Sequence, residues 1–155
     1  MTPAIIHCLI RHAHAEDGPD DAGRPLSDLG REQARQLGEL LAREKDFQPA
    51  EIWHSPLLRA RETAELLVAA LGREVPLRLR RGLEPEGDPQ ITAAALRASE
   101  QPVALVGHEP HLSALAATLL HPTSRPHAIA FPKAAAMAAT REGSAWRVRW
   151  LARVP

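Results

Sequence analysis

The chain has 155 residues, 45% hydrophobic and 25% charged, a composition that predicts a single globular domain over residues 1–155. Its 19 Lys and Arg residues equal its 19 Asp and Glu residues, so no overall field attracts nucleic acid or an anionic membrane. Only 3% of the residues are aromatic and none is Tyr, which leaves little for base stacking, so we expect no nucleic-acid partner.

The first predicted element is a buried strand that ends on Arg11 and His12. Residues 5–10 form a largely apolar run too short for a helix, typical of a strand buried on both faces of an α/β sheet. Ligands bind at the carboxyl ends of strands in such sheets. A guanidinium holds two anionic oxygens and a neutral imidazole can attack phosphorus, so this pair suits a phosphate. The plain alternative is a strand that ends in polar surface residues.

The next segment is a polar loop followed by a helix. Residues 16–24 are rich in Asp, Gly and Pro, as expected of a flexible segment near a site. Ser27 is a plausible N-cap for a helix running to about Lys45. We expect its core face to consist of Leu29, Gln33, Ala34, Leu37, Leu40 and Leu41.

A second strand and helix follow at residues 50–72. Residues 50–54 predict a brief strand, and Ser55-Pro56 predicts a helix start with serine as cap and proline at the first helical position. Gly72 is placed to end this helix. Its expected buried side is Ala60, Ala64, Leu67, Val68 and Leu71. Arg59 lies in the first turn, where free amides favour an anion, although an exposed surface arginine is the alternative.

The middle of the chain predicts an edge strand, an acidic turn and a short helix. Residues 75–80 alternate apolar with polar, as in a strand near a sheet edge. Residues 82–89 are rich in turn formers, and one of their carboxylates could be a general acid, with an acidic surface loop as the alternative. Asp88 or Pro89 then opens a helix through Ala98.

A second fully apolar run, residues 103–107, ends on His108 much as the first ends on Arg11 and His12. Glu109-Pro110 starts a helix after it. The apolar stripe of this helix is Leu112, Leu115, Ala116 and Leu119. Three strand-to-helix junctions that carry Arg-His, Arg and His are hard to attribute to chance.

The last part of the chain predicts β-structure. Residues 127–151 contain two or three candidate strands, with residues 141–144 as the turn between the last two. Residues 134–139 are interpreted as strand, although alanine favours helix. Trp146, Val148 and Trp150 alternate and are expected on one face.

Four segments together resemble the histidine phosphatase superfamily, especially its small SixA-type branch of protein phosphohistidine phosphatases. They are residues 9–13 (Leu-Ile-Arg-His-Ala), 25–30 (Pro-Leu-Ser-Asp-Leu-Gly), 55–64 (Ser-Pro-Leu-Leu-Arg-Ala-Arg-Glu-Thr-Ala) and 106–110 (Val-Gly-His-Glu-Pro). The resemblance implies a phosphoglycerate mutase-like fold, a three-layer α/β/α sandwich with a mostly parallel central sheet. It also implies that His12 is the nucleophile and forms a phosphohistidine intermediate, while Arg11, Arg59 and His108 hold the phosphoryl oxygens.

Two positions depart from the family pattern. The usual Arg-His-Gly is Arg-His-Ala here, which puts the methyl group of Ala13 beside the nucleophile, a variant compatible with the small branch. Larger phosphomonoesterase members carry a glutamate general acid in the segment that resembles Leu83-Glu84, but the surrounding pattern matches loosely. Glu84 is therefore the candidate general acid without a firm motif behind it.

The expected reaction needs no metal or other cofactor. Cations beside His12 would lower its pKa and keep it neutral for attack, and they would stabilise the transferring phosphoryl group. The chain lacks a long insertion that could close over a small molecule, so the expected substrate is phosphohistidine on a protein. A small phosphate ester is the alternative, and phosphate-like anions should bind in either case.

Two further alternatives remain open from the sequence. A metal-dependent hydrolase could use His12-x-His14 and His108-x-x-His111 as paired zinc ligands, although two guanidinium groups nearby would repel the cation. A catalytically idle phosphate-binding module is the other.

Location is also predicted from the sequence. The single Cys8 excludes an internal disulfide, and its place in the first strand favours a buried structural thiol. No apolar run is long enough to span a membrane and the N-terminus lacks the pattern of a signal peptide, so we expect a cytoplasmic protein.

Overall fold

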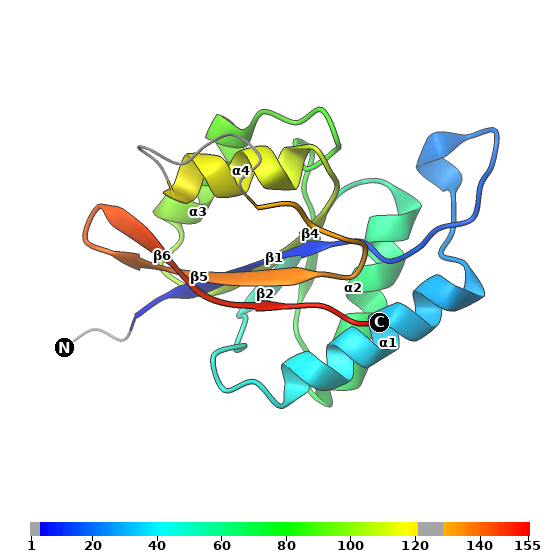
Figure 1. Ribbon diagram of the computed structural model, residues 1–155, viewed down its shortest axis with the longest axis horizontal. Helices are drawn as coiled ribbons and strands as arrows, with labels where there is room; N and C mark the ends of the chain where they lie inside the picture. The colour runs from blue at the N-terminus through cyan, green and yellow to red at the C-terminus, as the bar shows by residue number, and fades with distance from the viewer. Residues whose placement is uncertain (1–3, 121–128) are drawn as a thin grey trace.

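A six-stranded sheet runs through the molecule, flanked by helices on both faces (Figure 1). The computed structural model describes residues 4–120 and 129–155. The strands are β1 (Ile6–Arg11), β2 (Glu51–His54), β3 (Leu77–Leu79), β4 (Val103–Gly107), β5 (Ala136–Glu142) and β6 (Ala145–Ala152). Their spatial order is β3-β2-β4-β1-β5-β6. The first three pairings are parallel and the last two antiparallel, so the expected mostly parallel sheet is confirmed.

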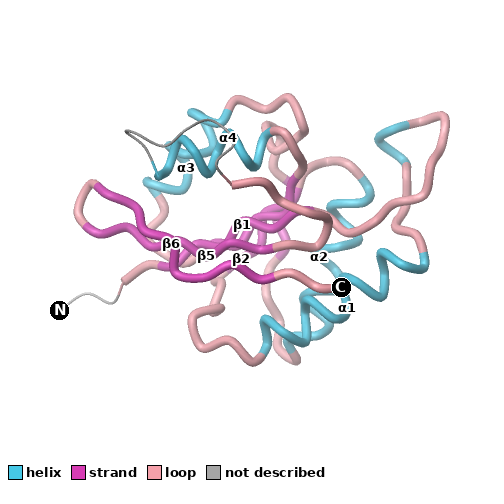
Figure 2. The backbone as a smooth tube through the Cα atoms, viewed as in Figure 1, coloured by secondary structure: helices cyan, strands magenta, loops and turns pink. Residues whose placement is uncertain are grey.

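The helices divide the core into two halves. They are α1 (Asp28–Ala42), α2 (Leu58–Leu71), α3 (Pro89–Ala98) and α4 (His111–Leu120), with a short 3-10 helix at Asp21–Gly23. Helices α1 and α2 cover one face and α3 and α4 the other, as the cyan helices on either side of the magenta strands show in Figure 2. This arrangement is the three-layer α/β/α sandwich that the resemblance implied.

Strand β1 is buried on both faces, as predicted. Cys8 and Ile10 pack into the core beneath α1 and α2, whereas Leu9 packs into the core beneath α3 and α4. Alternate side chains of a strand point to opposite faces, so a strand between two helix layers must be apolar throughout. The central position of β1 brings its carboxyl end, Arg11, to the middle of the sheet edge.

Helix α1 begins as predicted but buries a different stripe. The Ser27 side chain accepts a hydrogen bond from the Gly30 amide at 3.0 Å, which confirms the cap. The helix ends at Ala42 rather than Lys45, and Leu29 and Leu40 are 55% and 41% exposed, so their assignment to the core was wrong. The reason is close packing on α2. The buried residues of α1 are Gly30, Ala34, Leu37, Gly38 and Leu41, and a Cβ on Gly38 would lie 2.5 Å from that of Ala70.

Helix α2 starts later than the Ser55-Pro56 pattern indicated. Its first residue is Leu58, and Leu57 occupies the cap position without a side-chain hydrogen bond. Ser55 instead bonds to His108, described below. The predicted end is confirmed, since Gly72 has a φ of 70°, a left-handed conformation that glycine adopts readily. On the predicted buried side, Ala60, Ala64 and Leu67 are buried and Val68 and Leu71 half-buried.

The elements from β3 to α4 follow the predictions closely. Strand β3 lies at the sheet edge, although it is shorter than residues 75–80. Asp88 caps α3 by accepting from the Gln90 amide at 2.9 Å, and the helix ends at Ala98. The predicted stripe of α4 is fully buried: Leu112, Leu115, Ala116 and Leu119.

The C-terminal hairpin contains a bulge that the alternation did not reveal. Strands β5 and β6 pair through the predicted turn, but Ala138 pairs with Trp150 while Ala139 pairs with Val148, so the register shifts by one residue. Trp146 and Val148 therefore pack beneath α3 and α4, whereas Trp150 packs on the other face. The expected single face for all three was wrong. The start of the predicted β-region, at His127, lies outside the described residues.

None of the helices in the described residues combines the length and the apolar character needed to cross a membrane.

Candidate active site

Three parallel strands end side by side and bring the predicted polar residues together. Strand β4 pairs with β1 on one side and β2 on the other, so the residues that follow these strands meet at one edge of the sheet. The pairing continues past the strands: the His12 amide donates to the Gly107 carbonyl at 3.0 Å and the Ser55 amide to Val106 at 3.3 Å. The rings of His12 and His108 consequently lie 4.9 Å apart between centroids.

The His12 side chain is held as a neutral imidazole with one free nitrogen. Its Nδ1 lies 2.6 Å from the carbonyl oxygen of Ala13, so Nδ1 carries the proton and donates it, which leaves the Nε2 lone pair available. Burial lowers the pKa of His12 to about 4, with further lowering by the charges of Arg59, Arg11 and Lys133. The predicted direction is right, but burial is the larger cause rather than the neighbouring cations. A neutral imidazole with a free Nε2 can act as a nucleophile.

His108 is almost fully buried and oriented by a hydroxyl group. Its Nε2 lies 2.6 Å from Ser55 Oγ, which also accepts a hydrogen bond from the Leu57 amide at 3.2 Å. Burial lowers the pKa of His108 to about 3, with His12 and Arg59 contributing. Among the described residues, the buried Nδ1 atom has no hydrogen-bond partner. A polar ring atom left unpaired beside His12 is suited to a ligand.

Arg11 and Arg59 supply two fixed positive charges around His12. The Arg11 Nη1 donates to the Phe131 carbonyl at 2.8 Å, and its buried Nε is without a hydrogen-bond partner in the described part of the chain. Arg59, the second residue of α2, is only 5% exposed and donates to the Asp21 carbonyl at 2.8 Å and to the Asp21 carboxylate at 3.3 Å. Two guanidinium groups anchored in this way are able to hold a tetrahedral oxyanion.

Helix α2 is tied to the segment after β1 by two side chains. Thr63 Oγ1 accepts from the Ala13 amide at 3.1 Å and donates to the Arg59 carbonyl at 2.7 Å. The preceding residue, Glu62, accepts a hydrogen bond from the Leu26 amide with its carboxylate at 2.8 Å. Because one threonine joins both segments, His12 and Arg59 keep a fixed mutual position.

Glu84 makes no described hydrogen bond to the residues of this cluster. Its carboxylate accepts a hydrogen bond from the Gly82 amide at 2.7 Å, within its own turn. The Glu84 charge acts on His111, whereas the charges that act on His12 are those of Arg59, Arg11 and Lys133. The hydrogen bond of Glu84 thus stays within its own turn, although the neighbouring Leu83 carbonyl lies close to Gly107, the residue before His108.

The histidines of the metal alternative are engaged with hydroxyl groups. His14 Nδ1 lies 2.6 Å from Ser27 Oγ, and His111 Nε2 lies 3.0 Å from Thr92 Oγ1. Within residues 4–120 and 129–155, no three His, Cys, Asp or Glu side chains are grouped to hold a metal ion.

Sequence reasoning missed three residues of this site: Ser55, Asp21 and Glu109. Ser55 was interpreted as a helix cap, and Asp21 only as part of a flexible polar loop near the site, without a role of its own. The Glu109 carboxylate accepts a hydrogen bond from the Phe131 amide at 3.1 Å. The Phe131 carbonyl in turn accepts the hydrogen bond from Arg11. The order of the parallel strands would have revealed Ser55, because it follows β2 as His108 follows the neighbouring β4.

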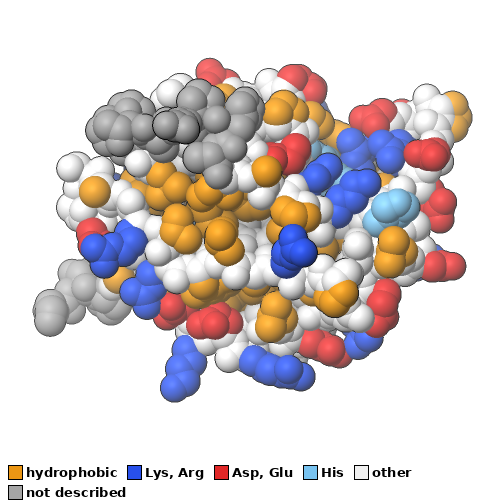
Figure 3. Space-filling view, viewed as in Figure 1, with side chains coloured by type: hydrophobic (Ala, Val, Ile, Leu, Met, Phe, Trp, Pro, Cys, Tyr) orange, Lys and Arg blue, Asp and Glu red, His pale blue; other side chains and the backbone are white. Residues whose placement is uncertain are grey.

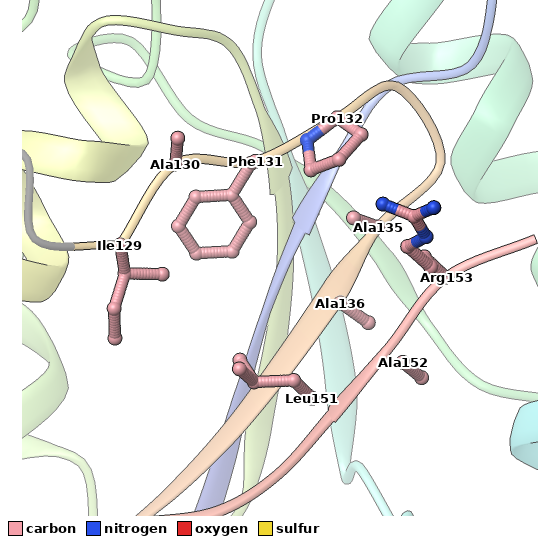
Figure 4. Close-up of a pocket in the computed structure, with 9 residues that line it drawn as sticks. All are labelled: Ile129, Ala130, Phe131, Pro132, Ala135, Ala136, Leu151, Ala152 and Arg153. Atoms are coloured by element: carbon pink, nitrogen blue, oxygen red, sulfur yellow. The ribbon is translucent and has the colours of Figure 1, made fainter.

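An apolar hollow of about 300 Å³ lies beside the loop that holds Arg11. It is lined by residues 129–132, 135–136 and 151–153, and the side chains of Ile129, Phe131 and Leu151 surround it in Figure 4. Figure 3 shows hydrophobic side chains gathered over the middle of this face, with basic (Lys or Arg) and histidine side chains to their right. The polar cluster thus borders an apolar surface.

Comparison with known families matches the chain over residues 7–85 to the model of the histidine phosphatase superfamily (branch 1). A curated relative, an uncharacterized protein of Picosynechococcus sp., is 35% identical over 111 residues. That alignment covers 67% of this chain, and the chain spans 66% of the length of the relative.

Solved structures with the same fold include phosphatases with different substrates. The protein histidine phosphatase SixA in complex with tungstate superposes with a TM-score of 0.85 at 24% identity, over 96% of this chain and 97% of that one. A mycobacterial glucosyl-3-phosphoglycerate phosphatase superposes with a TM-score of 0.73 at 21% identity, over 95% and 98% of the two chains. At these identities the similarity establishes the fold.

Proposed function

The chain belongs to the histidine phosphatase superfamily, and on that premise we propose that it removes the phosphoryl group from phosphohistidine on a protein. In this proposal His12 is the nucleophile, and Arg11, Arg59 and His108 hold the phosphoryl oxygens. A phosphatase that acts on a small phosphate ester is the alternative, since relatives of the same fold include one.

The proposed reaction has two steps. His12 Nε2 forms a bond to phosphorus while the bond between phosphorus and the leaving group breaks, and the leaving group takes the electron pair of that bond. Water then attacks phosphorus, the bond to Nε2 breaks, and phosphate departs with both protons of the water. His12 returns to its neutral form, because Nδ1 keeps its proton throughout and donates it in the hydrogen bond to the Ala13 carbonyl.

The surrounding cations carry most of the catalytic effect in this proposal. Phosphoryl transfer leaves charge spread over the three non-bridging oxygens, and fixed donors aimed at that charge stabilise the transition state. Arg11, Arg59 and the unpaired Nδ1 of His108 are donors of this kind, provided Nδ1 bears the proton. The Ser55 hydroxyl favours that tautomer when it donates to His108 Nε2.

The position of Glu84 is the observation that carries the choice of phosphohistidine. Expelling an alkoxide needs a proton donor, whereas an imidazole leaving group can be protonated in advance. The Glu84 carboxylate accepts a hydrogen bond from the Gly82 amide, so it is engaged as an acceptor within its own turn rather than held as a proton donor toward His12. The apolar hollow beside the site also favours a protein substrate.

We therefore expect Glu84→Gln to leave phosphohistidine turnover within about twofold of wild type, because no proton transfer from Glu84 is needed. Among phosphate esters, kcat/KM should rise steeply as the pKa of the leaving group falls. The measurement is turnover of a phosphohistidine protein and of a series of alkyl and aryl phosphates. Glu86→Gln is the matched control, since Glu86 is an exposed carboxylate of the same turn.

The contrary result is a flat dependence on the leaving group together with a large loss of ester hydrolysis in Glu84→Gln. That pair would make Glu84 a working general acid and the protein a small-molecule phosphomonoesterase.

Acid pH should weaken the fold before it stops the chemistry. The unfolded chain protonates His12 below its ordinary pKa of 6.5, whereas the folded chain does so only near 4. The free energy of unfolding should therefore decrease as pH falls from 6.5 toward 4, because the unfolded state binds more protons. The folded enzyme should keep its neutral nucleophile over the same range.

The check is kcat for an acid-stable aryl phosphate, measured from pH 7 to 4 beside denaturant unfolding at each pH. An acid limb of kcat near pH 6.5 in the folded enzyme would show that burial does not hold His12 neutral.

The cytoplasmic location and the independence of metal belong to the same proposal. Activity should survive chelators, and phosphate, vanadate or tungstate should inhibit competitively.

A further inference from the structure

One carboxylate reaches into the cationic site from the loop between β1 and α1. The Asp21 carboxylate lies 3.3 Å from Arg59 Nη2 and 3.1 Å from Arg24 Nη1, and the Asp21 carbonyl accepts from Arg59 Nη1 at 2.8 Å. Its charge also acts on His108. The side chain is 65% exposed, so a negative charge open to solvent sits beside the buried positive groups.

This carboxylate is an acceptor rather than an acid. The hydrogen bond from Arg24 and the charge of Arg59 lower the pKa of Asp21, so it stays ionised at neutral pH. An ionised carboxylate has no proton to give to a departing alkoxide, but it accepts hydrogen bonds from cationic groups strongly.

The reaction geometry sends the leaving group toward solvent, on the side of phosphorus opposite His12. His12 is 6% exposed and His108 1% exposed, so the site is closed beneath the phosphoryl group. Asp21 is the exposed charged partner of the Arg59 guanidinium and lies on the open side. A leaving group that departs there passes close to a negative charge.

We propose that Asp21 selects the leaving group: its carboxylate accepts a hydrogen bond from the protonated imidazole of phosphohistidine, and it disfavours esters whose leaving group is anionic. This inference rests on the proposed function and assigns the substrate selection of that site to one residue. It complements the position of Glu84, because a site without a nearby proton donor favours a leaving group that is already protonated.

The proposed step balances without a further reactant. The bond between phosphorus and one imidazole nitrogen of the substrate breaks, and that nitrogen keeps the electron pair. The other imidazole nitrogen already bears a proton, which it donates in a hydrogen bond to the Asp21 carboxylate. The substrate histidine therefore leaves as neutral imidazole. His12 Nε2 forms the new bond to phosphorus.

A purely structural role for Asp21 makes a different prediction. If Asp21 only anchors the loop of residues 16–24 onto Arg59, its loss should lower the turnover of every substrate in the same proportion. Selection of the leaving group instead changes the ratio between cationic and anionic substrates. The ratio is therefore the measurement that separates the two roles.

The test compares kcat/KM of wild type, Asp21→Asn and Asp17→Asn. The substrates are a phosphohistidine peptide, 4-(aminomethyl)phenyl phosphate and 4-carboxyphenyl phosphate. The para substituents of the two aryl leaving groups carry opposite charges. Asp17→Asn removes the same charge from the same loop, but the Asp17 side chain is fully exposed and lies 3.9 Å from Arg24. Circular dichroism and thermal unfolding verify that each variant is folded.

In Asp21→Asn the ratio of the cationic to the anionic aryl ester should fall roughly 10- to 100-fold, the range of one charged hydrogen bond. Turnover of the phosphohistidine peptide should fall with the cationic ester. Asp17→Asn should keep the wild-type ratio. An unchanged ratio in Asp21→Asn, or an equal loss on all three substrates, overturns the inference.

The two aryl esters keep this test separate from the proposed function. If wild type hydrolyses both esters but not the phosphohistidine peptide, the proposed function fails, while the ester ratio still decides the role of Asp21. If the peptide is turned over and the ratio does not respond to Asp21→Asn, only the inference about Asp21 fails.

Discussion

Replacing His12 with alanine is expected to abolish turnover and leave the fold intact. Loss of a nucleophile costs on the order of 10⁶-fold in kcat in a well-studied hydrolase, subtilisin, and the proposed reaction has no step that avoids His12. The side chain contributes little to the architecture, since within residues 4–120 and 129–155 its ring makes a single hydrogen bond, to the neighbouring Ala13 carbonyl. The backbone bonds that hold the strand end, from His12 to Gly107 and from Ala134 to His12, do not depend on the imidazole.

The measurement pairs circular dichroism with trapping of the intermediate. Wild type mixed with a labelled substrate should acquire a phosphoryl label that is labile in acid and stable in base, as expected of phosphohistidine, and His12→Ala should acquire none. His14→Ala is the control, because His14 lies two residues away and is bonded to Ser27 instead. Substantial activity or labelling of a folded His12→Ala protein would show that another residue is the nucleophile.

The positions of His12 and His108 could be predicted because they depend on a general rule. His108 follows a fully apolar run and His12 a largely apolar one that ends on Arg11, and the carboxyl ends of parallel strands meet at one edge of a sheet. The pairing of β1 with β4 then brings residues almost a hundred positions apart to a ring distance of 4.9 Å. The local sequence predicts where each strand ends, and the rule for parallel sheets predicts that these ends lie close together.

Ser55 shows why the rest of the site was not predicted. Serine before proline is a common helix start, and this local preference was outweighed by a hydrogen bond to His108, 53 positions away. Asp21 is similar, because nothing in residues 16–24 indicates that a loop aspartate will meet an arginine of α2. Contacts between distant segments of this kind leave no periodic pattern in the sequence.

The errors in the fold have the same physical origin. Leu29 and Leu40 fit a helical stripe, but α1 approaches α2 through Gly38 and buries that side instead. The alternation of β6 was interrupted by a bulge that moves Trp150 to the other face. Periodicity identifies an element and its approximate faces, whereas packing against the neighbouring element decides which residues are buried.

The second large effect is expected at Arg59. Arg59→Ala should lose about 2.7 to 4 kcal/mol of transition-state stabilisation, the range found when one preorganised donor is removed from an oxyanion site. In this protein the loss should lie toward the upper end, because Arg59 is 5% exposed and its charge acts on both His12 and His108. Arg61→Ala is the matched control, since Arg61 lies on the same helix turn with an exposed side chain paired to Glu65.

Arg59→Lys separates charge from geometry at this position. Lysine restores the positive charge but cannot present a planar fork to two oxygens, so it should recover only part of the lost kcat/KM. The three donors of lysine also radiate from a single nitrogen, whereas Arg59 reaches the Asp21 carbonyl and the Asp21 carboxylate from two separate nitrogens, Nη1 and Nη2, so lysine cannot reproduce this spacing. The measurement is kcat/KM together with the inhibition constant of vanadate or tungstate for wild type, Arg59→Ala, Arg59→Lys and Arg61→Ala. From wild type to the lysine variant to the alanine variant, kcat/KM should fall and the inhibition constant should rise. Equal activity of the lysine variant and wild type would mean that position 59 supplies charge alone, and unchanged activity of the alanine variant would remove Arg59 from the phosphoryl site.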